Sequence, residues 1–282
     1  MQTLQIGIIG LGLIGGSLAK AIKKHTPHTV YGLNRSKETE QKALTCGAMD
    51  GVLTDEALSG CDLLFVGLYP ALTVKTVLEK LPLLKKGCVI ADLCGIKREV
   101  CNALCAPCSA AGVTFIGAHP MAGREFSGFD YTTPDLFQRA PFILTPTEGT
   151  EEEARAVKML EELALAVGFR GAVVTTPENH DRMIAYTSQL AHVLSNAYVK
   201  SPCAKEHTGY SAGSFKDLTR VAYLNEEMWT ELFLQNRDNL TQELSLLINN
   251  LTAYKQAMEA GDADTLKALL REGREIKEQL QS

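Results

Sequence analysis

The sequence lacks any run of apolar residues long enough to cross a membrane. A spanning helix needs about 20 such residues, and the best candidate, residues 63–74, is interrupted by Gly67 and Pro70. The apolar segment 4–18 has no basic residues ahead of it, which argues against a secretory signal peptide. These absences predict a cytoplasmic protein that does not bind a membrane.

An excess of positive charge is also absent. The 282-residue chain has a formal net charge of −5, so there is no electrostatic reason to expect nucleic acid as a partner. Its hydrophobic content of 45% and charged content of 22% are ordinary for a globular protein. An anionic substrate would therefore need a few locally placed cations.

Eight cysteines are the unusual feature of the composition. The cytosol keeps thiols reduced, so a disulfide framework is not expected. Cys101, Cys105 and Cys108 have a spacing that could hold part of an iron–sulfur cluster. They fall, however, in a segment (98–111) with the pattern of a helix, and cysteine is a common small core residue. We therefore expect core packing and no metal.

The first 175 residues alternate short β-rich runs with helical stretches such as 17–24, 72–80 and 151–167. Continuous apolar runs are typical of strands covered on both faces. The alternation predicts an α/β fold with a Rossmann-type, doubly wound parallel sheet. The expected strands are 4–9, 29–33, 62–67, 88–93, 114–118, 142–145 and 171–175.

After about Thr176 the pattern is helical throughout, with expected helices at 178–199, 226–259 and 263–280. Gly261 can end one helix and Asp262 can cap the next. We expect two domains: a dinucleotide-binding domain at 1–176 and an all-helical domain at 177–282.

The loop Gly10-Leu11-Gly12-Leu13-Ile14-Gly15 lies between the first expected strand and the first expected helix. In a dinucleotide site, Gly10 permits the tight turn, Gly12 lets the pyrophosphate approach the backbone, and Gly15 lets the helix pack closely. The helix N-terminus then offers free N–H groups to the phosphates. The context predicts a nicotinamide dinucleotide as cofactor.

The end of the second expected strand favours NADP. NAD sites usually have an acidic residue there for the ribose 2′-OH, whereas this chain has Asn34-Arg35-Ser36. Arg35 and Ser36 can donate hydrogen bonds to a 2′-phosphate, although Arg35 could also be a solvated loop cation, so NAD stays possible. The loop Gly67-Leu68-Tyr69 is placed to cover the cofactor's sugars or, equally well, to serve a structural role.

Oxidation of an alcohol by hydride transfer needs a base, and histidine is suited to this near neutral pH. His119 directly follows the strand 114–118, at the end where open α/β sheets place their active sites. His192 shares a helical face with Ser188 and, with some drift, Asn196, although a solvent-facing stripe would have the same spacing.

Arg220, in the helical domain, is the candidate cation, against the default of a surface arginine. Trp229 is more often a core residue than a ligand contact.

Several motifs then match one family in order and at similar spacing: Gly10-Leu11-Gly12-Leu13-Ile14-Gly15-Gly16-Ser17, His119-Pro120-Met121-Ala122-Gly123, Asn179-His180-Asp181, Ser188-Gln189-Leu190-Ala191-His192, Phe215-Lys216-Asp217-Leu218-Thr219-Arg220 and Met228-Trp229. With them, nearly the whole chain resembles the prephenate/arogenate dehydrogenases of tyrosine biosynthesis. The resemblance implies NAD(P)-dependent oxidative decarboxylation of prephenate to 4-hydroxyphenylpyruvate, in a cleft between the domains of a homodimer joined through its helical domain.

The resemblance also implies roles for the candidate residues. His119 would accept the proton of the substrate hydroxyl, while hydride leaves the carbinol carbon for the nicotinamide and the ring carboxylate departs as carbon dioxide. Ser188 and His192 would contact the substrate, and Arg220 would pair with one of its carboxylates.

Three positions depart from the family pattern. The family commonly has Asp-x-Gly-Ser-x-Lys, with its serine near the catalytic histidine and the nicotinamide. Here residues 92–97 carry Gly95 at the serine position, so Gly95 is a candidate cofactor contact that cannot supply a hydroxyl. Another group or water would have to polarise His119. Gln189 stands where many members have histidine.

The third departure is Arg124, which precedes Glu125 and stands where a small polar residue is frequent. A cation at 124 favours prephenate, with its two negative charges, whereas Glu125 could attract the ammonium of arogenate. We expect prephenate, with arogenate as the alternative. Two further readings are another two-domain reductase, which would leave 119–123 without a role, and a dinucleotide-binding dimer without turnover.

Overall fold

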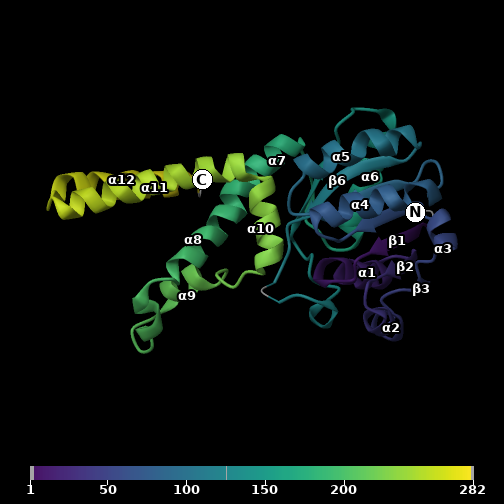
Figure 1. The fold of residues 1–282 in the computed structure, drawn as a ribbon, viewed down its shortest axis with the longest axis horizontal. Helices are drawn as coiled ribbons and strands as arrows, with labels where there is room; N and C mark the ends of the chain where they lie inside the picture. Colours follow the sequence, from purple (N-terminus) through teal and green to yellow (C-terminus); the bar gives the residue numbers. More distant parts are fainter. Residues whose placement is uncertain (1–2, 125, 281–282) are drawn as a thin grey trace.

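The computed structural model describes residues 3–124 and 126–280. Its α/β half contains one eight-stranded sheet in the order β3-β2-β1-β4-β5-β6-β7-β8 (Figure 1). The strands are β1 (Gln5–Ile9), β2 (Thr29–Leu33), β3 (Gly51–Val52), β4 (Leu63–Val66), β5 (Val89–Asp92), β6 (Thr114–Pro120), β7 (Pro141–Thr145) and β8 (Gly171–Val174). All seven strands expected from the sequence are present, and β3 is the additional one.

Alternate residues of the central strands point to opposite faces of this sheet and build two cores. Leu63 and Phe65 of β4 belong to one cluster, and Leu64 and Val66 belong to the other. The first cluster is closed by α1 (Leu13–His25), α2 (Lys37–Thr45) and α6 (Glu151–Ala166). The second is closed by α3 (Asp55–Ser59), α4 (Pro70–Lys80) and α5 (Arg98–Ala110). The expected doubly wound fold is therefore confirmed.

The sheet is mostly rather than entirely parallel, which corrects the sequence-based expectation. β7 pairs antiparallel with β6, while the other neighbouring strands run parallel. In the described residues of the connection between β6 and β7, 121–124 and 126–140, the one helical element is the short 3-10 turn η2 (Phe129–Tyr131), and no helix crosses the sheet. Without a crossover the chain re-enters the sheet from the end at which it left, so the strand direction reverses.

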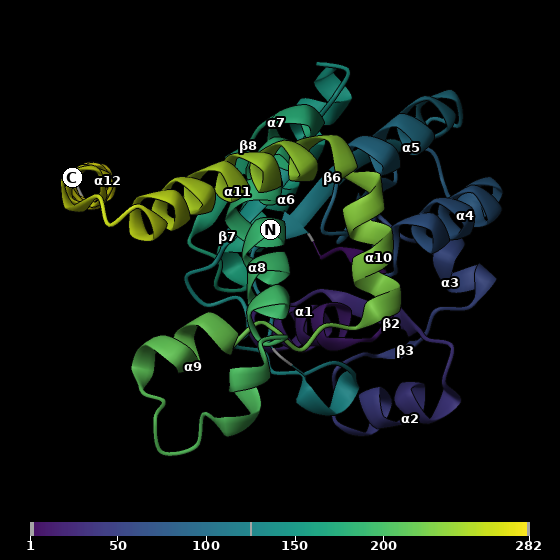
Figure 2. The same ribbon diagram turned by 60° about the vertical axis from the view of Figure 1, so that its left-hand side comes forward.

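The remainder of the described chain, from 177 onward, is helical. It comprises α7 (Pro177–Ile184), the π-helical turn η3 (Ala185–Gln189), α8 (Leu190–Tyr198), the 3-10 turn η4 (Pro202–Glu206), α9 (Gly213–Thr219), α10 (Glu226–Gln235), α11 (Arg237–Glu259) and α12 (Ala263–Gln279). In the α/β half, a further 3-10 turn, η1 (Leu81–Leu83), follows α4. α11 and α12 form an arm that projects away from the sheet (Figures 1 and 2).

Two details of the helical half differ from the sequence pattern. The expected helix 226–259 is two helices, because Asn236 at their junction leaves helical geometry and turns its amide into the core, donating to the Asp181 carbonyl and to Gln189 Oε1. The expected helix 178–199 contains the π turn at Ser188. The predicted stop at Gly261, with a positive φ of 64°, and the Asp262 cap are both confirmed.

No helix within the described residues is both long and apolar enough to span a bilayer. The eight cysteines are free thiols. Cys101 and Cys108 are buried on α5 within the second core cluster, and Cys105 is partly buried beside Thr147. In residues 3–124 and 126–280, no three histidine, cysteine or acidic side chains converge in a way that could hold a metal ion.

Candidate active site

The glycine loop has the geometry of a phosphate-binding turn. Gly10 has a φ of 92°, and a Cβ there would collide with the carbonyl of Gly67, while a Cβ on Gly15 would collide with the carbonyl of Gly10. At Gly12, by contrast, a Cβ would meet no described atom within 4 Å. The N-terminus of α1 has neither a side-chain cap nor an acidic residue in its first turn. Its free N–H groups and the open surface at Gly12 fit a pyrophosphate.

The end of β2 closes over this loop. Asn34 Oδ1 accepts a hydrogen bond from the Leu11 N–H at 3.1 Å, so the asparagine holds the glycine loop in place. Arg35 and Ser36 are exposed, and the Ser36 hydroxyl accepts from the Thr39 N–H as the cap of α2.

The Glu40 carboxylate is hydrogen-bonded to the end of β2, where it accepts from the Asn34 N–H. Both of its oxygens are engaged, one by the Asn34 N–H at 3.0 Å and the other by Lys37 Nζ at 2.8 Å. Burial alone would raise its pKa, but these two donors reverse the effect and leave the pKa of Glu40 lowered. The carboxylate is thus committed to the protein rather than offered to a ribose.

The loop after β4 lies against the glycine loop. The Gly67 N–H donates to the Ile9 carbonyl at 2.8 Å, and Gly67 limits the space at Gly10. Leu68 is partly buried and its carbonyl accepts from Thr73 Oγ1, whereas the Tyr69 side chain is exposed. Position and exposure allow Leu68 and Tyr69 to contact a bound dinucleotide.

His119 lies at the carboxyl end of β6 and is tied to the helical half through a second histidine. Its Nδ1 lies 2.9 Å from His180 Nε2, and His180 Nδ1 lies 2.7 Å from Asp181 Oδ1. The two rings meet edge to face, with centroids 5.1 Å apart. The His119 side chain is partly exposed, and no hydrogen bond from the described residues engages its Nε2. Burial and the neighbouring His180 and Lys97 hold the pKa of His119 well below its usual range.

A buried ion pair fixes the backbone immediately before His119. Lys97 Nζ contacts Asp92 Oδ2 and also donates to the Ala118 carbonyl at 2.7 Å, while Asp92 Oδ1 accepts from the Ala118 N–H at 3.1 Å. Both side chains are fully buried. Burial alone would lower the pKa of Lys97, but the Asp92 charge reverses this and the pKa is raised. Both backbone groups of Ala118 are thereby held.

A second group of side chains surrounds His192 on α8. His192 Nδ1 donates to the Ser188 carbonyl at 2.8 Å, and the ring packs on Trp229 with centroids 4.1 Å apart. Burial lowers the pKa of His192, and the charge of Arg220 lowers it further, which places the guanidinium near this ring. Trp229 is therefore a wall of the candidate site rather than a core residue.

α8 also positions the chain on both sides of Arg220. Ser195 Oγ donates to the Leu218 carbonyl at 2.6 Å, and Asn196 Nδ2 donates to the Ala222 carbonyl at 3.0 Å. Asn196, which the sequence placed on one face with Ser188 and His192, thus has a structural role. Gln189 is buried and donates to the Leu232 carbonyl of α10 at 3.1 Å, which links η3 to α10.

The remaining predicted residues are less constrained. Gly95 faces α10, since a Cβ there would lie 3.7 Å from the Leu232 side chain. Arg124 is exposed in the loop that follows β6. Glu125 lies outside the described residues.

Sequence reasoning gave no role to His180, Asp181, Asp92 or Lys97. His180 and Asp181 stand in a motif that carries the family resemblance, and Asp92 and Lys97 stand in the segment that departs from it at Gly95. Their pairing depends on contacts across the fold, because 61 residues separate His119 from His180 and 84 separate Lys97 from Asp181. One signal was available in the sequence: Asp92 falls within the expected apolar strand 88–93, and a charged group buried there is nearly always paired.

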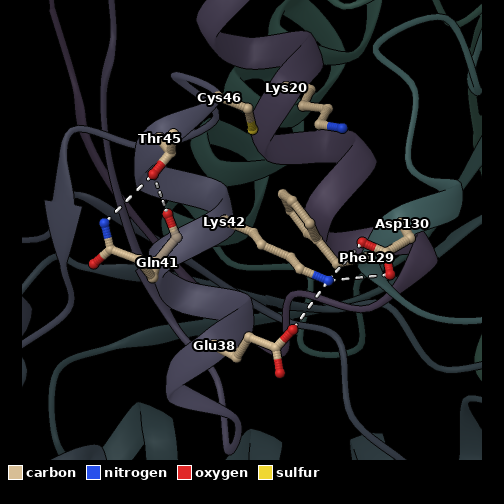
Figure 3. A pocket seen from close by; sticks show the side chains of 8 residues that line it. All are labelled: Lys20, Glu38, Gln41, Lys42, Thr45, Cys46, Phe129 and Asp130. Atoms are coloured by element: carbon tan, nitrogen blue, oxygen red, sulfur yellow. Dashed lines mark hydrogen bonds and ion pairs between the residues drawn. The ribbon is translucent and has the colours of Figure 1, made fainter.

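A separate hollow of 540 Å³ lies between α1, α2 and η2 (Figure 3). Lys42 crosses it to form ion pairs with Asp130 and Glu38, and Lys20 lies over the Phe129 ring. Its charges are matched within the protein, and it contains none of the residues described above, so it is distinct from the candidate active site.

Comparison with known proteins shows the family to which the chain belongs. A family model for the nucleotide-binding domain of prephenate dehydrogenase matches residues 18–173, and one for its dimerization domain matches residues 176–272. The chain belongs to the prephenate dehydrogenase family. The resemblance seen in the sequence motifs is therefore confirmed, and with it an oxidoreductase of tyrosine biosynthesis.

Individual relatives cover nearly the whole chain. The cyclohexadienyl dehydrogenase of Zymomonas mobilis is 31% identical over 96% of this chain and 94% of its own. The structure of Aquifex aeolicus prephenate dehydrogenase with hydroxyphenyl propionate and NAD+ is 26% identical, with a TM-score of 0.83 over 99% of this chain and 98% of that one. Synechocystis arogenate dehydrogenase is 27% identical, with a TM-score of 0.79 over 98% of this chain and 99% of that one.

Proposed function

We propose that this protein oxidises and decarboxylates prephenate to 4-hydroxyphenylpyruvate, with NADP as the preferred hydride acceptor. The observation that carries the proposal is His119, at the carboxyl end of a central strand, with Nδ1 bound to protein and Nε2 available. A base must be neutral to accept a proton, and the lowered pKa of His119 keeps it neutral at pH 7.

The chain's own residues supply the proton transfer and the charge recognition. His119 Nε2 accepts the proton of the substrate hydroxyl. Arg220 pairs with one substrate carboxylate from beside His192 and Trp229, and Ser188 contributes a hydroxyl from the π turn. π turns are frequent at functional sites because they displace one residue from the regular helical position.

Arg124 favours prephenate over arogenate, because an added ammonium would be repelled by a cation at this position. The exposed side chain can turn toward a ligand. Glu125 is retained as a candidate substrate contact on sequence grounds alone.

NADP is proposed from the surroundings of the glycine loop. The loop 10–15 would hold the pyrophosphate, and Leu68, Tyr69 and Gly95 would contact the rest of the dinucleotide. When bound, the nicotinamide accepts hydride from the carbinol carbon. Arg35 and Ser36 would bind the 2′-phosphate, and Asn34 would keep the two loops together. Glu40 does not compete for this position, since both of its oxygens are engaged.

We further propose a homodimer formed through α11 and α12, with the domain division at residues 176/177. Half or more of the surface of several apolar side chains on these helices is exposed, which a partner chain would cover: Leu246, Ile248, Leu251 and Met258 on α11, and Leu270 and Ile276 on α12. The free thiols fit a cytoplasmic location.

Steady-state assays with prephenate and arogenate, each with NADP and NAD, test the proposal. We expect the highest kcat/KM for prephenate with NADP. A higher value for arogenate would make the protein an arogenate dehydrogenase, and absence of turnover in all four combinations would favour a non-enzymatic dinucleotide-binding dimer.

The substitution His119→Asn tests whether His119 is the base. We expect it to lower kcat by about 10²- to 10⁴-fold while the protein still binds NADP. Turnover close to that of the wild type would overturn the assignment of His119 as the base.

A further inference from the structure

We propose that His180 and Asp181 are positioning residues, which hold His119 in the tautomer whose Nε2 carries a lone pair and receive the positive charge after proton transfer. The proposal rests on the proposed function, in which His119 is the base. It explains how this chain acts without a serine hydroxyl at position 95.

The direction of each hydrogen bond follows from the ionised Asp181. Burial alone would raise the pKa of this carboxyl, but the bond to His180 and the N–H donors of Arg98 and Lys97 reverse the effect and lower the pKa. A carboxylate only accepts hydrogen bonds, so His180 must carry its proton on Nδ1, 2.7 Å from Asp181 Oδ1. His180 Nε2 is then an acceptor.

The same reasoning continues to His119. Because His180 Nε2 accepts, His119 Nδ1 must be the donor across the 2.9 Å contact. In a neutral imidazole only one nitrogen carries a proton, so His119 Nε2 has a free lone pair. This is the nitrogen that no described residue engages, and it is therefore available to a substrate hydroxyl.

The pair also provides a place for the transferred proton. As the substrate O–H bond breaks, its electron pair stays on oxygen and an Nε2–H bond forms on His119, which becomes an imidazolium. Its Nδ1 proton can then move to His180 Nε2, leaving His119 neutral. The positive charge thereby comes to rest on His180, next to the Asp181 carboxylate. His119 gains one proton on Nε2 and loses one from Nδ1, whereas His180 gains one on Nε2 and keeps the one on Nδ1, so His180 becomes the imidazolium.

Asp181 is well placed for this role because it is rigidly held. Lys97 N–H donates to Oδ1 at 2.7 Å and Arg98 N–H to Oδ2 at 3.0 Å. The Arg98 guanidinium also pairs with Asp238 at 2.6 Å and donates to Asn236 Oδ1 at 3.1 Å. These contacts join α5 to α7 and α11, and α7 continues directly into η3, which carries Ser188.

Two substitutions of His180 separate a positioning role from a merely structural one. In His180→Asn the side-chain amide can occupy the place of Nδ1 and keep the contact with Asp181, but it is too short to reach His119. In His180→Gln the amide extends to the place of Nε2, where its oxygen can accept from His119 Nδ1. His28→Gln is the matched control, because His28 is equally buried and accepts from the Leu4 N–H far from these residues.

We expect His180→Asn to lower kcat by about 100-fold, within the range of general base catalysis, and His180→Gln by about ten-fold, with the KM for prephenate and the Kd for NADP changed less than about two-fold. His28→Gln should retain wild-type kcat. Nitrogen NMR of the histidine side chains gives a second readout: His119 should be protonated on Nδ1 in the wild type and gain the Nε2-protonated form in His180→Asn.

The proposal is overturned if His180→Asn is no worse than His180→Gln, if both retain a kcat within about three-fold of the wild type, or if wild-type His119 is protonated on Nε2. Failure of the proposed function has a different signature, because the wild type would then turn over neither prephenate nor arogenate. The tautomer of His119 can be measured in either case.

Discussion

The junction between the α/β half and the helical half differs from the outlying surfaces of the molecule in how its side chains are paired. At the junction, Asp92, Lys97, His180, Asp181 and Asn236 are all buried, and every one has a protein partner. Within residues 3–124 and 126–280, Gln235 Oε1 is the one buried side-chain polar atom without a hydrogen bond. The outlying parts instead expose cations at the end of β2 and apolar side chains on the α11–α12 arm.

This difference indicates where the molecule depends on other molecules. The junction is complete within one chain, so a change there should cost stability or catalysis. In the function that we propose, the end of β2 binds a ligand and the arm binds a second chain, so a change there should cost binding or association and leave the fold intact. The expected outcomes below are ordered from the largest effect to the smallest.

The strongest test at the junction removes the charge of Lys97. Lys97→Met leaves the Asp92 carboxylate buried without its cation, and breaking a buried pair in this way costs about 3–5 kcal/mol of unfolding free energy. Urea denaturation monitored by circular dichroism would measure the loss. Lys85→Met is the control, because its ion pair with Asp62 is partly exposed and should contribute about 0–1 kcal/mol. Equal effects of the two substitutions would contradict the contrast.

On the arm, Ile248→Glu should separate the chains without unfolding them. Ile248 is 57% exposed on α11, and a carboxylate placed in an apolar interface is strongly unfavourable. Light scattering after size-exclusion chromatography should show the mass of a dimer falling to that of one chain, with NADP binding retained. Asn102→Glu is the control, since residue 102 is exposed on α5 in the α/β half, outside the α11–α12 arm. A dimer that persists in Ile248→Glu would exclude this face as the interface.

The same contrast explains what the sequence could and could not predict. The strands and both cores follow from local apolar runs such as 63–66, and His119 was found because it directly follows the strand expected at 114–118, although in the structure it is part of the longer β6. The ion pair of Asp92 and Lys97 and the role of His180 were missed, because each depends on partners from a distant element. Trp229 was expected in the core because its contact with His192 joins two helices and cannot be read from the residue pattern of either helix.

The break between α10 and α11 was missed for the same physical reason. Asparagine is tolerated in a helix at modest cost, so Asn236 does not signal an end by itself. What ends the helix is the pairing of its amide with Asp181 and Gln189, which exists only after the helices have packed.

Buried histidines make the stability of the protein dependent on pH. Burial is the largest cause of a lowered pKa at His28, His119, His180 and His192. Their folded-state pKa values lie below the unfolded value of about 6.5, so the unfolded chain binds more protons and acidification favours it. Stability is fully present above about pH 6.5 and falls below it, by at most about 1.4 kcal/mol per pH unit for each group.

Thermal unfolding at pH 7.5 and pH 5.5 would measure this effect, with a lower Tm expected at pH 5.5. His28→Gln should reduce the difference, because it removes one of these groups without touching the candidate site. A Tm that stays constant down to pH 5 would show that the histidines are not held neutral in the folded protein.

The smallest effect is expected at the end of β2, where a single exposed cation is proposed to distinguish the two dinucleotides. Arg35→Ala should lower kcat/KM for NADP by about ten-fold, equivalent to about 1.4 kcal/mol and close to the value of a hydrogen bond to a charged group. It should leave kcat/KM for NAD nearly unchanged, because NAD has no 2′-phosphate. Lys24→Ala is a suitable control, since Lys24 is an exposed cation paired with Asp135. If Arg35→Ala weakened both cofactors equally, the arginine would serve the loop itself, and Asn34 with Ser36 would have to account for any preference.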